Sequence, residues 1–412
     1  MAIIKPFAAV RPAQKYVEKL ISLPYDVMSR KEAAEMAKGN PVSFLHISRS
    51  EIDLPNCENP YDSEVYKKAK NNIKDFLSQG VLIQDNKPMF YIYRQTMEGR
   101  IQTGIVACVS IDEYQDNTIK KHEFTRVEKE LDRINHFDTC NANTEPVFLT
   151  YRDRNDLRDV IETQITNKTP VYDLVTSDGV GHTLWVVDND TIIKNLIEIF
   201  KEIPALYIAD GHHRSASAVK VGLKRREANP GYTGEEEFNY FMAVLFPDID
   251  LNIFDYNRVI KDLNGLTTQE FLNKLTELFS IEIIKKGPYR PEGKHIFSMY
   301  LDGHWYKLTA KESILSDDLV KGLDVSILQD HVLAPILNIQ DPRTDKRIDF
   351  VGGIRGLGEL ERRVCQDMTV AFALYPVSIT DLLAVSDQDR IMPPKSTWFE
   401  PKLGSGLFIH LL

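Results

Sequence analysis

The chain of 412 residues is poor in cysteine, and the few it has are scattered. Cys57, Cys108, Cys140 and Cys365 include no Cys-x-x-Cys pair. Zinc ribbons and dithiol redox centres are built on such pairs, so the sequence supports neither. We expect isolated reduced thiols, as is usual for a cytoplasmic protein.

Long apolar runs are also missing. No stretch approaches the ~20 apolar residues that a membrane-spanning helix needs. Lys5, Pro6 and Arg11 interrupt the apolar start of the chain before a signal-peptide core could form. We therefore expect a cytoplasmic protein with no membrane partner.

Basic charge is in the minority, with 50 Lys and Arg against 60 Asp and Glu and a formal net charge of −10. Proteins that bind duplex nucleic acid usually carry a basic bias, because neutralising phosphates supplies much of their affinity. We expect no nucleic-acid partner, and a nuclease is disfavoured for the same reason. The Walker A pattern G-x-x-x-x-G-K-[ST] is absent too, so a P-loop fold is unsupported. Small anionic ligands remain open, since a few focused donors are enough for them.

What the sequence does contain is an alternation of helical and strand signals, which predicts a mixed α/β fold. Apolar residues recur at helical spacing over residues 62–79, with Asp62 or Ser63 as the cap and Gly80 after the end. Two hairpins are expected, with turns at residues 98–99 and 302–303. Further helices are expected over residues 128–137, 191–202, 215–225, 268–279, 325–332 and 379–385, and strands over 146–151, 205–209 and 404–410.

Domain boundaries are weakly marked in a chain of this length, which suits two or three domains. We place three regions: an N-terminal α/β region at 1–152, a central core at 153–262, and a C-terminal α/β region at 263–412. The C-terminal region carries the Pro-rich tract of residues 392–402, which cannot form a regular helix.

The segment Tyr-Ile-Ala-Asp-Gly-His-His-Arg, residues 207–214, is the centre of the predicted chemistry. It ends a short apolar strand and opens a helix, whose first N–H groups and dipole attract anions. Gly211 lets a ligand approach the backbone closely, and the Arg214 fork can bind two phosphate oxygens. Asp210 can hold Mg²⁺ or orient a histidine. The residues that we expect to contact phosphate here are Gly211, His212, His213, Arg214 and Ser215.

Two other interpretations of this segment are open. Asp210 could simply satisfy Arg214 in an ion-paired loop with the histidines facing water. Asp210, His212 and His213 could instead bind a transition metal, although adjacent histidines point in different directions and rarely ligate one ion together.

A second candidate lies at residues 120–126, Lys-Lys-His-Glu-Phe-Thr-Arg, before a predicted helix. Glu123 is placed to act as a general base toward a substrate hydroxyl, with His122 and Arg126 as phosphate contacts. A capping or salt-bridging glutamate is the alternative. The alternating charges that follow, at residues 128–133, fit a solvated helix face.

Further cationic segments lie downstream. Lys395, Ser396, Thr397 and Lys402 stand in the Pro-framed loop and suit phosphate neutralisation, although surface lysines usually bind nothing specific. Arg355 belongs to another possible anion cradle beside the Gly-Gly pair at residues 352–353, together with Arg343, Lys346 and Arg347. Residues 40–49, Asn-Pro-Val-Ser-Phe-Leu-His-Ile-Ser-Arg, line a pocket or form a strand with polar edges.

These motifs resemble those of known proteins. Residues 209–214 resemble the signature of the ParB/sulfiredoxin superfamily, within which free-serine kinases carry a His-Glu pair upstream of Asp-Gly-His-His-Arg. The pair here is His122 and Glu123, although its separation from Asp210 is larger than in the small archaeal kinases. The whole chain also resembles a bacterial and archaeal family labelled a domain of unknown function. The resembling segments are residues 11–12, 23–27, 40–48, 121–126, 210–214, 256–258 and 392–402.

The resemblance implies a ParB/sulfiredoxin-like core with large additional α/β elements and a phosphotransferase that converts L-serine to O-phosphoserine. Glu123 would be the base, Asp210 would handle Mg²⁺, and His212 would contact the transferring phosphate. The donor would be pyrophosphate, ATP or ADP, and the partner a small-molecule substrate. A ParB-type nucleotide-binding regulatory module, or a kinase or phosphatase for another small hydroxylated metabolite, are the alternatives. The oligomeric state is not predicted.

Overall fold

The computed structural model describes residues 1–412, which form two compact units. Unit 1 comprises Met1–Lys121, Thr125–Leu251 and Pro401–Leu412, and unit 2 comprises His122–Phe124 and Asn252–Glu400. Strands from the regions expected at 1–152 and 153–262 share one sheet. The contacts therefore divide the chain into two units where the sequence led us to expect three.

A nine-stranded mixed sheet forms the centre of unit 1. Its order is β6-β11-β8-β12-β5-β4-β10-β9, with β1 paired to β5. The pairs β6–β11 and β8–β12 are parallel, and the remaining pairs are antiparallel. The strands are β1 (Ile4–Lys5), β4 (Phe90–Met97), β5 (Arg100–Ser110), β6 (Ile119–Lys120), β8 (Val147–Tyr151), β9 (Tyr172–Val175), β10 (Gly181–Val187), β11 (Leu206–Asp210) and β12 (Tyr240–Pro247).

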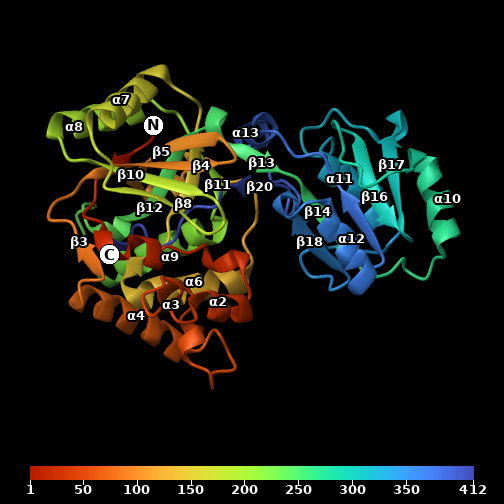
Figure 1. Ribbon diagram of the computed structural model, residues 1–412. Helices are drawn as coiled ribbons and strands as arrows, with labels where there is room; N and C mark the ends of the chain where they lie inside the picture. The colour runs from red at the N-terminus through yellow and green to blue at the C-terminus, as the bar shows by residue number, and fades with distance from the viewer. The chain divides into compact units, whose positions relative to one another are not determined.

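Helices cover both faces of this sheet (Figure 1). Helices α7 (Asn155–Asn167) and α8 (Asp190–Lys201) lie on one side, and α9 (His212–Ala228) lies on the other. Helix α6 (Val127–Cys140) packs on α9, and α4 (Ser63–Ser78) packs on α6. Shorter helices complete the unit: α1 (Val17–Leu20), α2 (Arg30–Ala37), α3 (Leu45–Ser48) and α5 (Ile111–Gln115).

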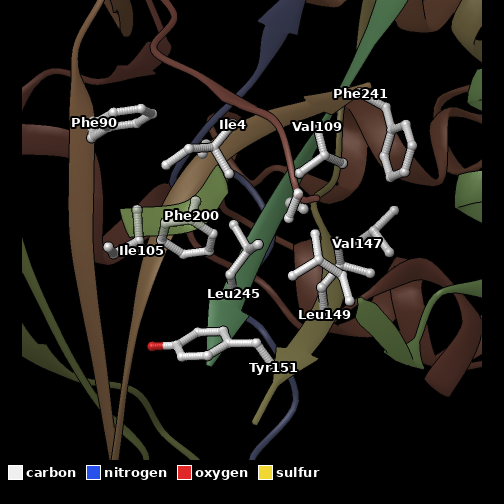
Figure 2. Close-up of a cluster of buried hydrophobic side chains, with 14 of the residues drawn as sticks. Ile4, Phe90, Ile105, Val109, Val147, Leu149, Tyr151, Phe200, Phe241 and Leu245 are labelled. Carbon is white, nitrogen blue, oxygen red and sulfur yellow. The ribbon is translucent and has the colours of Figure 1, made fainter. Parts of the chain in front are cut away.

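The main core lies between the sheet and its helices. Figure 2 shows side chains from β1, β4, β5, β8, β12 and α8 meeting there, Phe90, Tyr151 and Phe200 among them. Because both faces of the sheet are covered, its central strands are nearly continuous apolar runs. β8 is buried along its whole length, for example.

The C-terminal twelve residues return to unit 1. Strand β21 (His410–Leu411) pairs with β7 (Ala142–Asn143), and single bridges join Ser405 to Ser22 and Ile409 to Val10. The strand expected over residues 404–410 is therefore mostly irregular chain held by isolated bridges. A small ribbon of β2 (Val10–Pro12) and β3 (Leu82–Gln84) lies in the same unit.

Unit 2 is built on a six-stranded antiparallel sheet of order β15-β17-β16-β19-β14-β18, on which α12 (Leu357–Gln366) packs. A two-stranded ribbon of β13 (Asn252–Phe254) and β20 (Trp398–Glu400) joins the two ends of its main segment. The sheet strands are β14 (Tyr256–Ile260), β15 (Phe279–Ile284), β16 (Ile296–Leu301), β17 (His304–Ala310), β18 (Ile348–Gly352) and β19 (Val370–Ala373). The other helices are α10 (Thr268–Leu278), α11 (Asp324–Leu328) and α13 (Ile379–Asp387).

The predicted mixed α/β class is confirmed, and so are its clearest local signals. Both hairpins form, and Asp302 and Gly303 have φ values of 50° and 77°, as a tight turn of that type requires. Asp62 caps α4 by accepting a hydrogen bond from the Glu64 backbone. The helix expected over residues 325–332 is instead a short α11 that continues as a π-helix, Gln329–Leu333. None of the helices combines the length and the apolarity needed to cross a lipid bilayer.

Candidate phosphate site

The junction of β11 and α9 places the Asp-Gly-His-His-Arg segment at a strand end and a helix start, as the sequence predicts. Asp210 is the last residue of β11. Its Oδ1 accepts a hydrogen bond from the Gly211 N–H at 2.8 Å, and its Oδ2 accepts one from Lys402 Nζ at 2.9 Å. Burial opposes ionisation, but the nearby Lys402 ammonium and Arg214 guanidinium hold the pKa of Asp210 well below its usual range. Asp210 is therefore a carboxylate throughout the physiological pH range.

Gly211 gives the junction its shape. Its φ is +94°, in the left-handed region that glycine tolerates best, and no side chain caps α9. The first-turn N–H groups of α9 are thus not satisfied by a capping side chain, which is the arrangement that attracts anions at helix starts. A Cβ at position 211 would stand 3.1 Å from Arg214 Nε.

Arg214 is buried beneath this turn, with 2% of its surface exposed. Its Nη1 donates to the carbonyl oxygen of Pro146 at 2.5 Å, whereas its buried Nε has no hydrogen-bond partner. The Arg214 guanidinium is therefore held by a hydrogen bond at Nη1, while the hydrogen-bonding capacity of Nε is unused. The role of Arg214 as a phosphate contact stays a prediction.

The other residues of the segment are held by contacts within unit 1. His213 Nε2 accepts a hydrogen bond from the Arg126 backbone N–H at 3.0 Å, so Arg126 lies beside the motif through its main chain. His212 is buried in the first turn of α9. The Ser215 hydroxyl donates to carbonyl oxygens of its own helix turn, 3.0 Å from the oxygen of His212.

A buried carboxylate that the sequence interpretation missed lies next to the motif. Glu145 is fully enclosed, and its Oε1 accepts hydrogen bonds from Ser405 Oγ at 2.7 Å and from the Tyr25 N–H at 3.2 Å. Burial raises the pKa of Glu145, while the charges of Arg214 and Arg133 oppose that rise. The only sequence signal for Glu145 was an acidic residue directly before a buried strand.

The charged face expected on α6 is not solvated as predicted. Glu130, Asp132 and Arg133 are each less than 10% exposed, because α6 is sandwiched between α4 and α9. Arg133 donates through Nε and Nη2 to Asp132, and its guanidinium lies 3.9 Å from the ring centre of Tyr25. Asp132 and Arg133 thus form a buried ion pair, and buried Glu130 pairs with Lys220, whereas Glu128 is exposed as predicted.

The remaining predicted residues belong to unit 2. His122 Nε2 lies 3.3 Å from Thr397 Oγ1, and the His122 carbonyl accepts a hydrogen bond from the Met392 N–H at 2.9 Å. The His-Glu segment and the Pro-framed loop are therefore in contact. Ser396 Oγ donates to the carbonyl of Pro393 at 2.6 Å, and Lys395 is an exposed residue with a φ of 60°. Exposed Arg355 lies in a 3₁₀ turn, Gly353–Arg355.

Unit 2 also contains a buried cation that we did not predict as a site residue from the sequence. Arg258 on β14 is 3% exposed and donates only to backbone carbonyls, those of Tyr256 and Pro394. No carboxylate pairs with it, and burial lowers its pKa to about 10. A buried arginine without an acid is costly unless an anion compensates it, and Pro394 belongs to the lysine loop. The signal in the sequence was the Tyr-Asn-Arg segment at residues 256–258.

The structure thus brings the candidates together in two sets. Asp210, Gly211, Arg214 and Lys402 meet in unit 1, joined by Arg126 and His213. His122 and the loop of residues 392–397 meet in unit 2, with Glu123 adjacent in sequence.

Comparison with known proteins gives one sequence match and several solved structures. No curated protein matches the chain. A conserved hypothetical protein from Pyrococcus furiosus is 12% identical, with 74% of this chain and 95% of that chain covered and a TM-score of 0.38. SbnI from Staphylococcus aureus with a C-terminal truncation is 10% identical, with 74% and 87% covered and a TM-score of 0.41. A free serine kinase in complex with AMP is 13% identical, with 73% and 92% covered and a TM-score of 0.37.

TM-scores this low do not define a shared fold. The family match is of a different kind. Residues 4–326 match the model of DUF1015, described as a protein of unknown function. Because that model spans well over half of the chain, this protein belongs to the DUF1015 family.

Proposed function

We propose that this protein is a small-molecule phosphotransferase and that the β11–α9 junction handles the phosphate. The observation that carries the proposal is the contact of Asp210 with Lys402, beside a helix start without a capping side chain and the incompletely satisfied fork of Arg214. Phosphoryl transfer needs positioning and charge neutralisation more than covalent help from the protein. A carboxylate, two cations and the start of a helix without a capping side chain supply both at one strand end.

Magnesium fits this donor set. Mg²⁺ in phosphate sites is commonly held by one or two carboxylates together with phosphate oxygens and water. Asp210 is the carboxylate that would hold it, and its lowered pKa keeps it ionised, as a metal ligand must be. The ion would neutralise charge on the phosphate when bound.

L-Serine is the acceptor that we propose, on the resemblance of the His-Glu and Asp-Gly-His-His-Arg motifs to free-serine kinases. Glu123 would take the proton from the serine hydroxyl, and pyrophosphate, ATP or ADP would be the donor. Pyrophosphate suits the compact cationic segments best. The residues that we propose for phosphate and substrate contact are His122, Arg126, Gly211, His212, His213, Arg214, Ser215, Arg355, Lys395, Ser396, Thr397 and Lys402.

The test is a screen of pyrophosphate, ATP, ADP and CTP with free L-serine and Mg²⁺, read by O-phosphoserine formation. We expect product with at least one of the first three. Binding of CTP without product would favour a regulatory module, and product only with another hydroxylated metabolite would replace serine. If phosphoserine forms with ATP but not with pyrophosphate, the preference for pyrophosphate is wrong.

Glu123→Gln tests the base. The substitution keeps the size of the side chain and removes its basicity, so turnover should fall by about 10²–10⁴-fold while phosphoserine binding stays within about twofold. Calorimetry and a steady-state assay measure the two quantities. Glu128→Gln, an exposed glutamate in the first turn of α6, is the matched control. Unchanged turnover in Glu123→Gln would remove Glu123 from this role.

A further inference from the structure

Unit 1 contains a polar cavity, formed by α3, α4 and α6 and the segment before α2. We call it the tyrosine pocket, because Tyr25, Tyr61 and Tyr66 form its walls. Its volume is about 180 Å³, which leaves room for a small metabolite but not for a nucleotide, since pockets for drug-sized ligands measure roughly 300–1,000 Å³. Ser48 and Arg49 reach it from the end of the Asn-Pro segment at residues 40–49, to which the proposed function gives no role.

The pocket carries one cation in excess. Arg49 Nε donates to Glu51 at 2.7 Å, and Arg133 is paired with Asp132. Lys129 has no carboxylate partner, and its Nζ contacts only the hydroxyl of Tyr61, at 2.9 Å, and the face of that ring. An uncompensated ammonium beside aromatic walls favours an anionic ligand.

Three lining residues hold buried polar atoms without hydrogen-bond partners. These atoms are Ser48 Oγ, His136 Nδ1 and Arg133 Nη1, in side chains that are 2–4% exposed. Buried polar atoms are rarely left unpaired, and clusters of them in native structures call for an explanation. Arg133 Nη1 faces Glu145 Oε2 at 4.0 Å, so Ser48 Oγ and His136 Nδ1 are the two atoms that point to a ligand in the cavity.

His136 adds a requirement on that ligand. Its Nε2 lies 3.0 Å from the carbonyl oxygen of Ile47 and must donate to it, since a carbonyl only accepts. Burial and the neighbouring Arg133 lower the pKa of His136 to about 3, so the ring is neutral at physiological pH. Nδ1 is consequently an acceptor. A complementary ligand must carry a donor as well as its negative charge.

The pocket shares a buried network with the phosphate site. Tyr25 and Arg133 line the pocket, and both meet Glu145: the Tyr25 N–H donates to Glu145 Oε1, and Arg133 Nη1 lies 4.0 Å from Glu145 Oε2. Glu145 in turn interacts electrostatically with Arg214. Glu145 would therefore connect a ligand in the pocket to Arg214 of the Asp-Gly-His-His-Arg segment.

We propose that the tyrosine pocket binds a small carboxylate that also carries a hydrogen-bond donor, which is the chemistry of a free amino acid. Lys129 and Ser48 meet the carboxylate, and His136 Nδ1 accepts from the ammonium or hydroxyl group. The choice of L-serine as the amino acid rests on the proposed function. The pocket is then the site that selects the acceptor.

Titration calorimetry on the full chain tests this with three probes: L-serine, serinol, which lacks the carboxylate, and inorganic phosphate. We expect serinol to bind at least about tenfold more weakly than L-serine. Lys129→Gln should weaken L-serine binding about tenfold, and Ser48→Ala about fivefold, on the scale of one lost hydrogen bond or charge contact. Lys74→Gln, the same charge change at an exposed position of α4, should leave binding unchanged. Thermal melts confirm that each variant is folded.

The outcomes separate this inference from the proposed function. If the protein makes phosphoserine but Lys129→Gln and Ser48→Ala leave the KM for serine unchanged, the pocket assignment is overturned and the function stands. If serine binding falls in both variants but no donor yields phosphoserine, the pocket stands and the function is overturned. Loss of phosphate binding in Lys129→Gln, with serine binding intact, would also overturn the assignment.

Discussion

Asp210 keeps its charge in a half-buried place because Lys402 and Arg214 stand beside it. Its pKa is lower in the folded than in the unfolded chain, so it stabilises the fold above the unfolded value of about 4. That contribution is lost as the pH falls from there toward the folded value. The contact with Lys402 is therefore part of both the site and the stability of unit 1.

Lys402→Met should lower the free energy of unfolding at pH 7 by about 2–3 kcal/mol, because it leaves a poorly solvated carboxylate without its closest cation. The loss should shrink on acidification below pH 4, where Asp210 can take up a proton. Urea unfolding at pH 7 and pH 3.5 measures both values. Lys224→Met breaks a pair whose lysine is 65% exposed and should cost under about 1 kcal/mol. An equal loss in the two variants would contradict the role of burial.

His136 should make stability depend on pH over a different range. Burial and Arg133 lower its pKa from 6.5 to about 3, so folding favours the neutral ring. Its contribution is fully present above pH 6.5 and is lost as the pH falls, by about 1.4 kcal/mol per pH unit. His136→Gln should flatten the stability profile between pH 6.5 and 4.5, measured by urea unfolding at several pH values. His304→Gln, at an exposed position, is the control, and an unchanged slope in His136→Gln would count against a neutral buried ring.

At the scale of elements, the turn between β11 and α9 depends on a glycine for two separate reasons. Gly211 has a φ of +94°, and a Cβ there would meet Arg214 Nε at 3.1 Å. Gly39, after α2, has a φ of +74° but no neighbour within 4 Å of its would-be Cβ. Both positions require a left-handed backbone, but only at position 211 would a Cβ contact another side chain.

Gly211→Ala should therefore cost more than Gly39→Ala. The left-handed backbone costs an alanine about 1 kcal/mol at either site, and displacing the anchored Arg214 should add roughly another 1 kcal/mol at position 211. Phosphoserine formation should fall only in Gly211→Ala. Chemical unfolding and the activity assay test this together. Equal destabilisation in Gly211→Ala and Gly39→Ala would show that Arg214 can move away from the new Cβ at no cost in free energy.

The elements also show what the sequence could predict. The strand, glycine and helix around Asp210 were predicted correctly because apolar run, turn residue and helical spacing follow one another locally. The burial of Glu130, Asp132 and Arg133 on α6 was not predicted, since alternating charges give the same sequence pattern on a solvated face and in buried ion pairs. Glu145 and Arg258 were not predicted as site residues because their burial depends on strands distant in sequence, which no local pattern reveals. The functional roles of the site residues remain predictions.

At the scale of the whole molecule, unit 1 is assembled from three stretches of chain, with most of unit 2 inserted before the last. The chain passes between the units four times, at residues 121/122, 124/125, 251/252 and 400/401, so there is no single linker to recognise and composition did not locate the boundary. The last stretch is short but deeply buried: Leu407, Phe408 and Ile409 are each at most 1% exposed. It also delivers Lys402 to Asp210 and Ser405 to Glu145.

Ending the chain at Glu400 should consequently disrupt unit 1 and spare the sheet of unit 2. Losing three buried apolar side chains, at about 2–5 kcal/mol each, approaches the 5–15 kcal/mol stability of a typical domain. Hydrogen exchange should show lost protection in β5 and β12 and retained protection in β16 and β17. Removing Leu412 alone, a partly exposed residue, is the control and should change neither. Equal loss of protection in both units would mean that the two units fold cooperatively. Full protection in β5 and β12 would mean that unit 1 is stable without the last segment.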